Sequence, residues 1–224
     1  TDDTGDIGKE FAKKYKYIKY FYLKQIDGNG WVRPRMEAIK HAKGDILCMV
    51  DADAFYVNYY IKCCFETLFS DDKIGAVVPR MHFWDPSTFI SKYKSLLYEI
   101  KFNNPKIINK EINEGKHSPW IVKRKVYNRV GGYNIRDAYT EDTMLAKRIL
   151  KNEYKLVHDS RCHWYHKLEE KPVDVVKKNF KIGRMLATEN GLDAFDAKRI
   201  YFTIPLLIVI LSLIAGFSII PWII

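Results

Sequence analysis

The stretch "ILCMVDADAFY", residues 46–56, decides how the fold and the chemistry of this chain are interpreted. Five apolar residues, Ile46 to Val50, are followed at once by Asp51 and Asp53. An apolar run of this length, bounded by polar residues, predicts a buried strand. Two like charges so close together repel each other, which indicates that a positive group belongs beside them. The stretch therefore predicts a strand that ends at a site for a cation or a cationic side chain.

The composition is that of a packed, basic protein. The chain has 224 residues, of which 47% are hydrophobic and 14% aromatic, enough to bury a core. The formal net charge is +10, but no compact basic tract with interleaved aromatics resembles a nucleic-acid-binding platform. We therefore expect no nucleic-acid partner and favour a membrane surface. The four cysteines lack zinc-site spacing and are predicted to be reduced, mostly buried thiols in a reducing compartment.

Helical and strand-like patterns alternate along the chain, which predicts an α/β sheet with helices on its faces. Thr140 is the expected N-cap of one helix. Residues 103–118 are polar and predict a loop. The predicted strands are 17–23, 46–50, 74–79 and 154–159, and the predicted helices are 6–16, 35–44, 58–69, 87–102, 125–133 with a Gly-Gly stop, 140–152 and 173–191.

The end of the chain predicts a membrane segment. Residues 201–224 contain no charged residue, and the run exceeds the roughly 20 residues that cross a bilayer core. Lys198 and Arg199 precede it, so the positive-inside rule predicts a cell-membrane protein with residues 1–200 in the cytoplasm. The expected domains are a catalytic domain at 1–172, a basic amphipathic helical segment at 173–200 and a transmembrane segment at 201–224. The opening "TDDT" suggests a piece of a longer protein.

Two acidic pairs are the main candidates for chemistry. Asp51 and Asp53 follow a strand, where open α/β sheets bind ligands, and their hard oxygens suit Mg²⁺ or Mn²⁺ bridging to phosphates. The alternative is an ordinary polar turn. Glu141 and Asp142 open a predicted helix, where the helix dipole alone explains acidic residues. Their other interpretation is a carboxylate base that accepts a proton from an acceptor hydroxyl.

Other candidates each have two interpretations. Arg35 is either solvated or paired with a phosphate or an aspartate. His166 is a metal ligand or a phosphate contact. Trp120 stacks on a sugar or simply packs. Lys181 and Arg184 lie on the basic helix, where they form a solvated face or a phosphate-binding face.

Taken in order, these motifs resemble the family-2 glycosyltransferases of the GT-A fold. "TDDT" is similar to the tail of the family's "DDGSxDxT", and "GNGWVRPRMEAIKHAKGDILCMVDAD" to its "GxxxARNxGxxxAxGxxIxFxDxD". "VKRKVYNRVGGYN" resembles the family's basic pair, apolar pair and Gly-Gly-aromatic, and "TEDTMLAKRIL" its "xEDxxLxxRL". The resemblance covers residues 1–190. It implies a GT-A, Rossmann-like mixed sheet with flanking helices, and a nucleotide-sugar donor.

The resemblance also implies roles for single residues. By position, Asp51 contacts the nucleotide, Asp53 binds the metal and Asp142 is the general base of an inverting, one-step displacement at the anomeric carbon. A membrane location makes the expected acceptor lipid-linked, for example a polyisoprenyl phosphate, or a growing glycan. With a phosphate acceptor, Asp142 orients the nucleophile instead of deprotonating it.

The chain departs from the family in two places. The chain lacks the family's N-terminal strand and "DDG", where the family reads the nucleobase, so the sequence does not indicate the nucleobase. The QxxRW motif of processive polysaccharide synthases is absent. "KNFKIGRMLA" instead resembles the "QxxxxGR" variant of membrane-anchored members, with Gly183 and Arg184 matching and His166 upstream.

Two other functions fit part of the pattern. A haloacid-dehalogenase-type phosphatase also places DxD after an apolar strand, with Asp51 as a covalent nucleophile. It requires Thr or Val two positions after the second aspartate, where this chain has Phe55. A catalytically inactive, membrane-anchored sugar-nucleotide-binding module is the other alternative. Turnover of a sugar nucleotide separates these functions.

Overall fold

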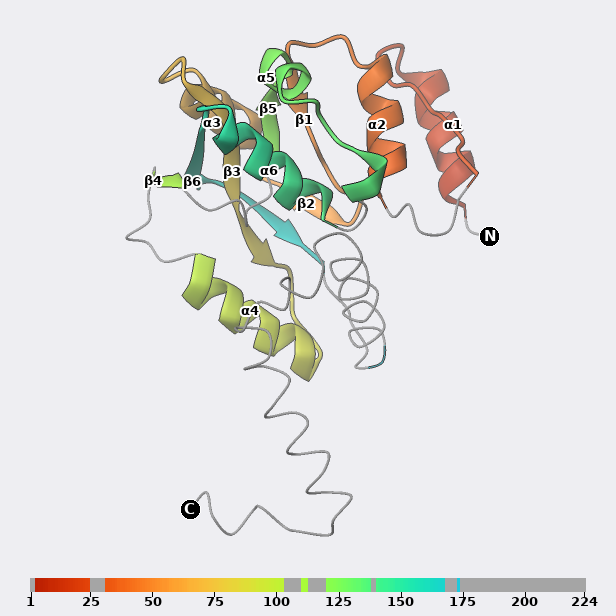
Figure 1. The fold of residues 1–224 in the computed structure, drawn as a ribbon. Coiled ribbons are helices and arrows are strands. Elements are labelled where there is room, and N and C mark those ends of the chain that lie inside the picture. Colours follow the sequence, from red (N-terminus) through yellow and green to blue (C-terminus); the bar gives the residue numbers. More distant parts are fainter. Residues whose placement is uncertain are drawn as a thin grey trace, which may run out of the picture. The chain divides into compact units, whose positions relative to one another are not determined.

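A computed structural model describes residues 3–24, 31–102, 110–112, 120–137, 140–167 and 173. The chain divides into two compact units, Thr1–Glu170 and Lys171–Ile224, and every element described here belongs to the first. The strands are β1 Ile46–Cys48, β2 Ala54–Tyr56, β3 Ile74–Phe83, β4 Lys110–Ile112, β5 Ile121–Lys123 and β6 Lys155–His166 (Figure 1). The helices are α1 Thr4–Lys14, α2 Val32–His41, α3 Tyr60–Leu68, α4 Phe89–Phe102, α5 Arg124–Arg129, the 3-10 turn η1 Ile135–Asp137 and α6 Glu141–Lys151.

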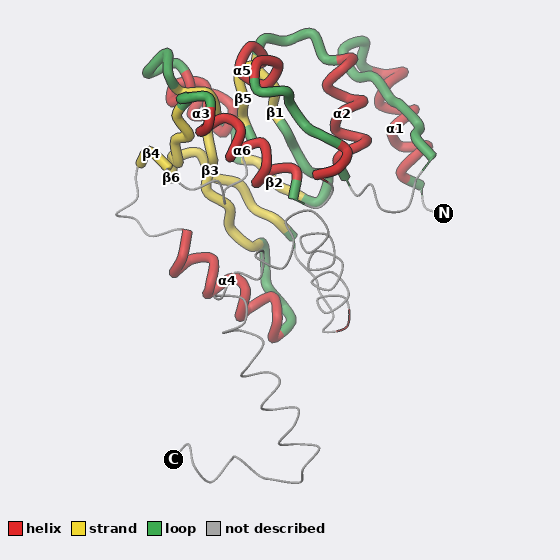
Figure 2. The backbone as a smooth tube through the Cα atoms, in the orientation of Figure 1, coloured by secondary structure: helices red, strands yellow, loops and turns green. Residues whose placement is uncertain are grey.

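The six strands form one mixed sheet in the order β1-β5-β3-β6-β2, with β4 paired to β6 (Figure 2). Its centre is the parallel pair of the two long strands, β3 and β6. The other ladders are antiparallel: β1 with β5, β5 with β3, β6 with β2, and β6 with β4. The long strands stay paired as far as Phe83 and His166, with register shifts after Ile74 and after Pro79. His166 also pairs with Ala54, the first residue of β2.

Helices pack on both faces of the sheet. On one face, α3 buries its apolar side against Val77 of β3, Ile121 of β5 and Trp164 of β6. On the other face, α5 and α6 approach so closely that a Cβ on Gly75 would lie 3.1 Å from Val126 and 3.2 Å from Ile149. The sheet is therefore buried on both sides, which explains why β3 begins as a continuous apolar run instead of an alternating one.

Most of the predicted elements are confirmed, with shifted bounds. The apolar run at 46–50 is β1, which is shorter, while the runs at 74–79 and 154–159 belong to the longer β3 and β6. The helix predicted at 35–44 begins earlier, at Val32, because Pro34 is tolerated in a first turn that needs no N–H partner. The short strands β2, β4 and β5, of three residues each, were not predicted.

One local prediction is wrong, and a second is confirmed in position but not in its hydrogen bond. Residues 17–23, all of them described, form no strand; they pair with no strand of the sheet, and Tyr17 and Tyr22 are largely exposed. Their alternating aromatic residues suit a strand, but the segment does not pair with the sheet. Thr140 occupies the N-cap position of α6, but its side chain makes no capping bond. Its hydroxyl donates instead to the Asp137 carbonyl at 3.2 Å, because η1 ends just before it.

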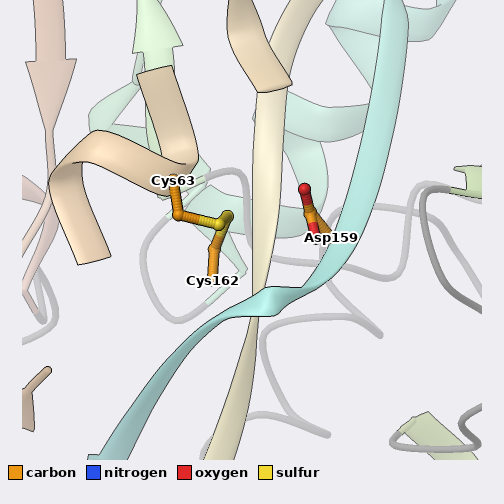
Figure 3. A group of neighbouring side chains, drawn as sticks. All are labelled: Cys63, Asp159 and Cys162. Carbon is orange, nitrogen blue, oxygen red and sulfur yellow. A yellow bond between two sulfur atoms is a disulfide. The ribbon is translucent and has the colours of Figure 1, made fainter. Parts of the chain in front are cut away.

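The prediction that all four cysteines are reduced is also wrong. Cys63 of α3 and Cys162 of β6 form a disulfide, while Cys48 and Cys64 are free (Figure 3). The packing of α3 on β6 brings their Cα atoms to 5.4 Å, a contact between residues 99 positions apart that no sequence spacing reveals. Closing so long a loop stabilises the fold by about 4–5 kcal/mol through the entropy of the unfolded chain.

A buried polar pair accompanies this disulfide. Asp159 of β6 is fully buried and accepts hydrogen bonds from Arg161 and from the hydroxyl of Thr67 on α3. Burial opposes ionisation of Asp159, but these hydrogen bonds outweigh it and lower the pKa of the carboxyl. Although Asp159 lies close to both sulfurs, the sulfurs are bonded to each other, so the cluster is structural.

The predicted membrane segment at 201–224 and nearly all of the basic segment at 173–200 lie outside the described residues. Among the helices that the structure does describe, none has the length and apolar character needed to cross a bilayer.

We predict that Gly132→Ala destabilises the fold more than Gly131→Ala. Both glycines follow α5 with positive φ, +82° at Gly131 and +57° at Gly132, where a side chain costs about 1–2 kcal/mol. A Cβ at Gly131 meets open space, but one at Gly132 would lie 2.4 Å from the Tyr127 ring. Urea unfolding of the full chain in mild detergent measures both, with Gly44→Ala as the unstrained control. Equal losses at 131 and 132 would contradict the close approach of Tyr127.

Candidate active site

Five separate segments of the chain meet beyond the end of β1. Asp51 and Asp53 follow β1, and the N–H of Met49 donates to the carbonyl of Trp120 just before β5. The β2–β6 ladder pairs Ala54 with His166, so the preceding Asp53 lies beside the imidazole. Helix α2 contributes Arg35, and the first turn of α6 contributes Glu141 and Asp142.

Arg35 joins these segments through one guanidinium. Its Nη1 donates to Glu141 Oε1 at 2.9 Å and to Asp142 Oδ1 at 3.1 Å. Its Nη2 donates to Asp51 Oδ1 at 3.1 Å. Asp51 and the pair Glu141–Asp142, which lie 90 positions apart in the sequence, therefore share one cation, which is the positive group expected beside Asp51. The ion pairs are mostly shielded, since the Arg35 side chain is 16% exposed and that of Glu141 only 8%.

The charges of the site perturb one another. Burial opposes the charge on Arg35, but Asp142, Glu141 and Asp51 outweigh it and raise the pKa of the guanidinium, which stays protonated. Burial raises the pKa of Glu141, and the neighbouring charge of Asp142 raises it further. Three carboxylates thus face one guanidinium, and with the nearby Asp53 the site retains a net negative charge that favours a further cation.

The outer part of the site has the donor set of a divalent metal site. Single ligand atoms of Asp51, Asp53 and His166 all lie within 4.8 Å of one another, and His166 Nε2 is 3.3 Å from Asp53 Oδ2. Two carboxylates and one imidazole suit Mn²⁺ well, and the carboxylates also suit Mg²⁺. The Asp53 side chain is 63% exposed, which leaves room for waters or phosphate oxygens in the remaining coordination positions.

Two tyrosines of the site were missed by the sequence analysis. Tyr133 OH donates to Asp142 Oδ1 at 3.2 Å, and its own N–H donates to Tyr127 OH at 2.9 Å. Tyr56 OH accepts the N–H of Asp51 at 2.9 Å, which closes the turn between β1 and β2. The Gly-Gly-aromatic motif was the available signal for Tyr133, because the turn at Gly131–Gly132 directs the following side chain to the start of α6.

Trp120 packs within the site. The Arg35 guanidinium lies over the Trp120 ring, 5.1 Å from the ring centroid. The Trp120 ring in turn meets the Trp164 ring edge-on. This contact adds a cation–π attraction to the ion pairs of Arg35. Lys181 and Arg184, the two other sequence candidates, lie outside the described residues.

Comparison with solved structures shows that this is a mixed α/β fold of the GT-A type. The mannosyltransferase PcManGT from Pyrobaculum calidifontis, solved with GDP-Man and Mn²⁺, superposes with a TM-score of 0.57 at 18% identity, over 84% of this chain and 51% of that one. A structure of residues 1–349 of S. aureus TarS in complex with UDP gives a TM-score of 0.50 at 16% identity, over 85% of this chain and 54% of that one.

Sequence comparison then identifies the family. The family model "Glycosyl transferase family 2" matches residues 1–152, so the chain belongs to that family. The "Probable glycosyltransferase YdaM" of Bacillus subtilis (strain 168) is 27% identical over 168 residues, which cover 70% of this chain and 38% of the relative. The chain thus matches only part of the length of these relatives.

We predict that Arg35→Met lowers the free energy of unfolding by about 2–4 kcal/mol at neutral pH, because three carboxylates lose their shared cation. The difference in free energy of unfolding between the variant and the wild type should shrink as the pH is lowered, since protonation relieves the repulsion among the carboxylates. Denaturant unfolding at two pH values measures it. Arg33→Met on the same helix is the matched control, because its guanidinium donates to the Lys24 carbonyl in an exposed contact. A similar loss in both variants would refute the role of Arg35.

We predict that Glu141→Gln gains stability relative to wild type as the pH rises. A carboxyl whose pKa is raised in the folded state binds its proton more tightly when the protein is folded. The wild type therefore loses stability as the pH rises through and above 4.5, the ordinary pKa of a glutamate. Glutamine does not titrate and still accepts from Arg35. Unfolding across the pH range measures the difference. Glu37→Gln should show the opposite slope, because hydrogen bonds from Lys40 and His41 lower the pKa of Glu37. A pH-independent difference for Glu141 would contradict the assignment.

Proposed function

We propose that this chain carries the catalytic site of a membrane-attached, metal-dependent, inverting glycosyltransferase that moves a sugar from a nucleotide-sugar donor to a lipid-linked or glycan acceptor. The observation that supports it most is the sharing of Arg35 by Asp142 and Asp51. It fixes a candidate base beside a candidate metal and donor site, as transfer between two bound substrates requires. The family membership leaves the phosphatase alternative without support.

Asp51, Asp53 and His166 are the residues that would hold Mg²⁺ or Mn²⁺. Their close spacing, their chemistry and the exposure of Asp53 fit such an ion. When bound, the ion neutralises the diphosphate of the donor and stabilises the departing nucleoside diphosphate. Without a cation, four carboxylates beside one guanidinium would repel a diphosphate, which is why we infer that donor binding requires the metal.

Asp142 is the proposed general base. Arg35 and Tyr133 both donate to its Oδ1, and together they fix the direction of the carboxylate. From this position Asp142 would take the proton of the acceptor hydroxyl as the oxygen attacks the anomeric carbon and the bond to the nucleotide breaks. With a polyisoprenyl phosphate as acceptor the nucleophile is already ionised, and Asp142 would orient it.

The donor class is supported by the structural relatives, whose titles name GDP-Man with Mn²⁺ and UDP. We propose that the donor is a nucleotide sugar whose base is guanine or uracil. Lys181 and Arg184 are proposed as phosphate contacts on the basis of the family-like "GR" motif alone.

The membrane attachment and the cytoplasmic side of the catalytic domain are proposed from the uncharged run at 201–224 and from Lys198 and Arg199 before it. A cytoplasmic location requires that reducing thiols do not reach the Cys63–Cys162 disulfide. Both residues are buried, which is consistent with that requirement.

We predict that Asp142→Asn lowers kcat by about 10²–10⁴-fold while donor binding persists, because only the proton acceptor is lost. The assay uses the full chain in detergent with Mn²⁺ or Mg²⁺ and UDP- and GDP-sugars, and it follows release of the nucleoside diphosphate. A glycan with free hydroxyls and a polyisoprenyl phosphate are tested as separate acceptors, and the full loss is expected with the hydroxyl acceptor. Asp53→Ala should instead raise the metal concentration for half-maximal rate at least about tenfold.

The matched control for both variants is Asp45→Asn, which changes an exposed aspartate just before β1. If Asp142→Asn keeps full activity with a hydroxyl acceptor, Asp142 is not the base. If a sugar nucleotide binds to the wild type but no acceptor supports its turnover, the chain is the inactive sugar-nucleotide-binding module considered above. Full activity on a soluble acceptor, with no gain from a lipid-linked one, would contradict the proposed acceptor class.

A further inference from the structure

Helix α4, Phe89–Phe102, presents an apolar stripe away from the domain. Phe89 is 83% exposed, Ile100 68% and Leu96 59%, and Tyr93 and Leu97 are exposed beside them. At 100° per residue these five side chains lie within one band along the helix. Soluble domains rarely leave a contiguous apolar surface of this kind in water, so the stripe indicates an interaction surface.

The orientation of α4 is fixed from its inner side. Glu99 accepts from Arg80 Nη2 at 3.1 Å and pairs with His82 Nδ1 at 2.8 Å, both on β3. The ring of Tyr98 meets that of Phe83 edge-on. The exposed stripe is therefore the outer face of a helix that the domain holds in place, and rotation of the helix cannot bury the stripe.

The first turn of α4 is also locally fixed. The N–H of Ser91 donates to Thr88 Oγ1 at 3.1 Å, and the N–H of Thr88 donates to Ser91 Oγ at 2.9 Å. This reciprocal pair satisfies two donors at the start of the helix, as a capping box does. The helix consequently persists up to Phe89, the most exposed residue of the stripe.

We propose that the outer stripe of α4 lies in the interfacial region of a lipid bilayer, with the helix axis parallel to the membrane plane. An interfacial helix of this kind has an apolar face flanked by cations that meet anionic lipid headgroups. On α4, Lys92 and Lys94 flank the stripe on its two sides, and the chain as a whole carries a net charge of +10. The uncharged run at 201–224 gives the same chain a second feature that fits a bilayer.

A second copy of the chain fits the stripe less well. A symmetric pairing through the stripes would bring the flanking lysines of both copies together, and like charges at such an interface disfavour association. The membrane proposal does not rest on the proposed glycosyl transfer. It has a consequence for that activity, however, because α4 is fixed to β3, which pairs with β6 as far as His166. The bilayer would thereby be held at a fixed position relative to the candidate metal site.

The test measures the surroundings of single nitroxide labels on the full chain reconstituted into phosphatidylcholine–phosphatidylglycerol vesicles. Leu96→Cys and Ile100→Cys place labels on the stripe. Lys62→Cys on α3 is the control at a charged position, because the Lys62 side chain is 79% exposed and pairs with Glu66. Burial raises the pKa of the native thiols to about 11 for Cys48 and about 12 for Cys64, which favours labelling of the introduced cysteine. The unsubstituted chain shows how much nitroxide label the native cysteines take up.

We expect the ratio of oxygen accessibility to nickel-complex accessibility to be severalfold higher at Leu96 and Ile100 than at Lys62. The depth should correspond to the headgroup–acyl boundary, about 5–10 Å into the interface. Equal ratios at the three positions would overturn the proposal. Spin–spin broadening between labels of two copies, without preference for oxygen, would overturn it too and would assign the stripe to self-association.

A second variant separates insertion of α4 from mere proximity caused by residues 201–224. Leu96→Glu combined with Ile100→Glu alters only exposed side chains, so the fold should be retained by circular dichroism. A label at Tyr93→Cys in this background should lose its preference for oxygen. If the label keeps that preference, the apolar stripe is not what places α4 in the bilayer, and the proposal fails. Neither readout depends on catalysis, so an inactive enzyme would leave the test intact.

Discussion

The ion-pair network of Arg35 is the interaction on which the site depends. Asp51 and the pair Glu141–Asp142 lie 90 positions apart in the sequence. In the fold their carboxylates meet at a site that is mostly shielded from solvent. Brought together alone, they would repel one another strongly at such low solvent exposure. One planar guanidinium reaches all three, because its two terminal nitrogens donate in different directions. The convergence of α2, the end of β1 and the start of α6 follows from this shared cation.

The backbone around the network is arranged to hold its members. The β2–β6 ladder places Asp53 beside His166, and the Tyr56 hydroxyl closes the turn that carries Asp51. The two left-handed glycines after α5 direct Tyr133 toward Asp142. The same contacts that stabilise the fold therefore orient the candidate base and the candidate metal ligands. Because the network leaves the site net negative, it also prepares the site for a divalent cation instead of excluding one.

The sequence predicted those features that depend on local pattern. An apolar run ending in two aspartates revealed β1 and the need for a positive partner, and Arg35 was among the candidates because its charge suits a carboxylate. The features it missed depend on contacts across the fold. The disulfide joins residues 99 positions apart, and the hydrogen bond of Tyr133 requires the turn at Gly131–Gly132. Residues 17–23 show the reverse case, in which a local strand pattern has no neighbouring strand to pair with.

The most direct test of the account is calorimetric titration of the full chain with GDP- and UDP-sugars, in Mn²⁺ and again in EDTA. The account holds that the carboxylates around Arg35 admit a diphosphate only together with a divalent cation. It predicts binding of a sugar nucleotide in Mn²⁺, loss of that binding in EDTA, and loss in Asp53→Ala at the same Mn²⁺ concentration. Equal affinity for the donor with and without the metal would contradict the account.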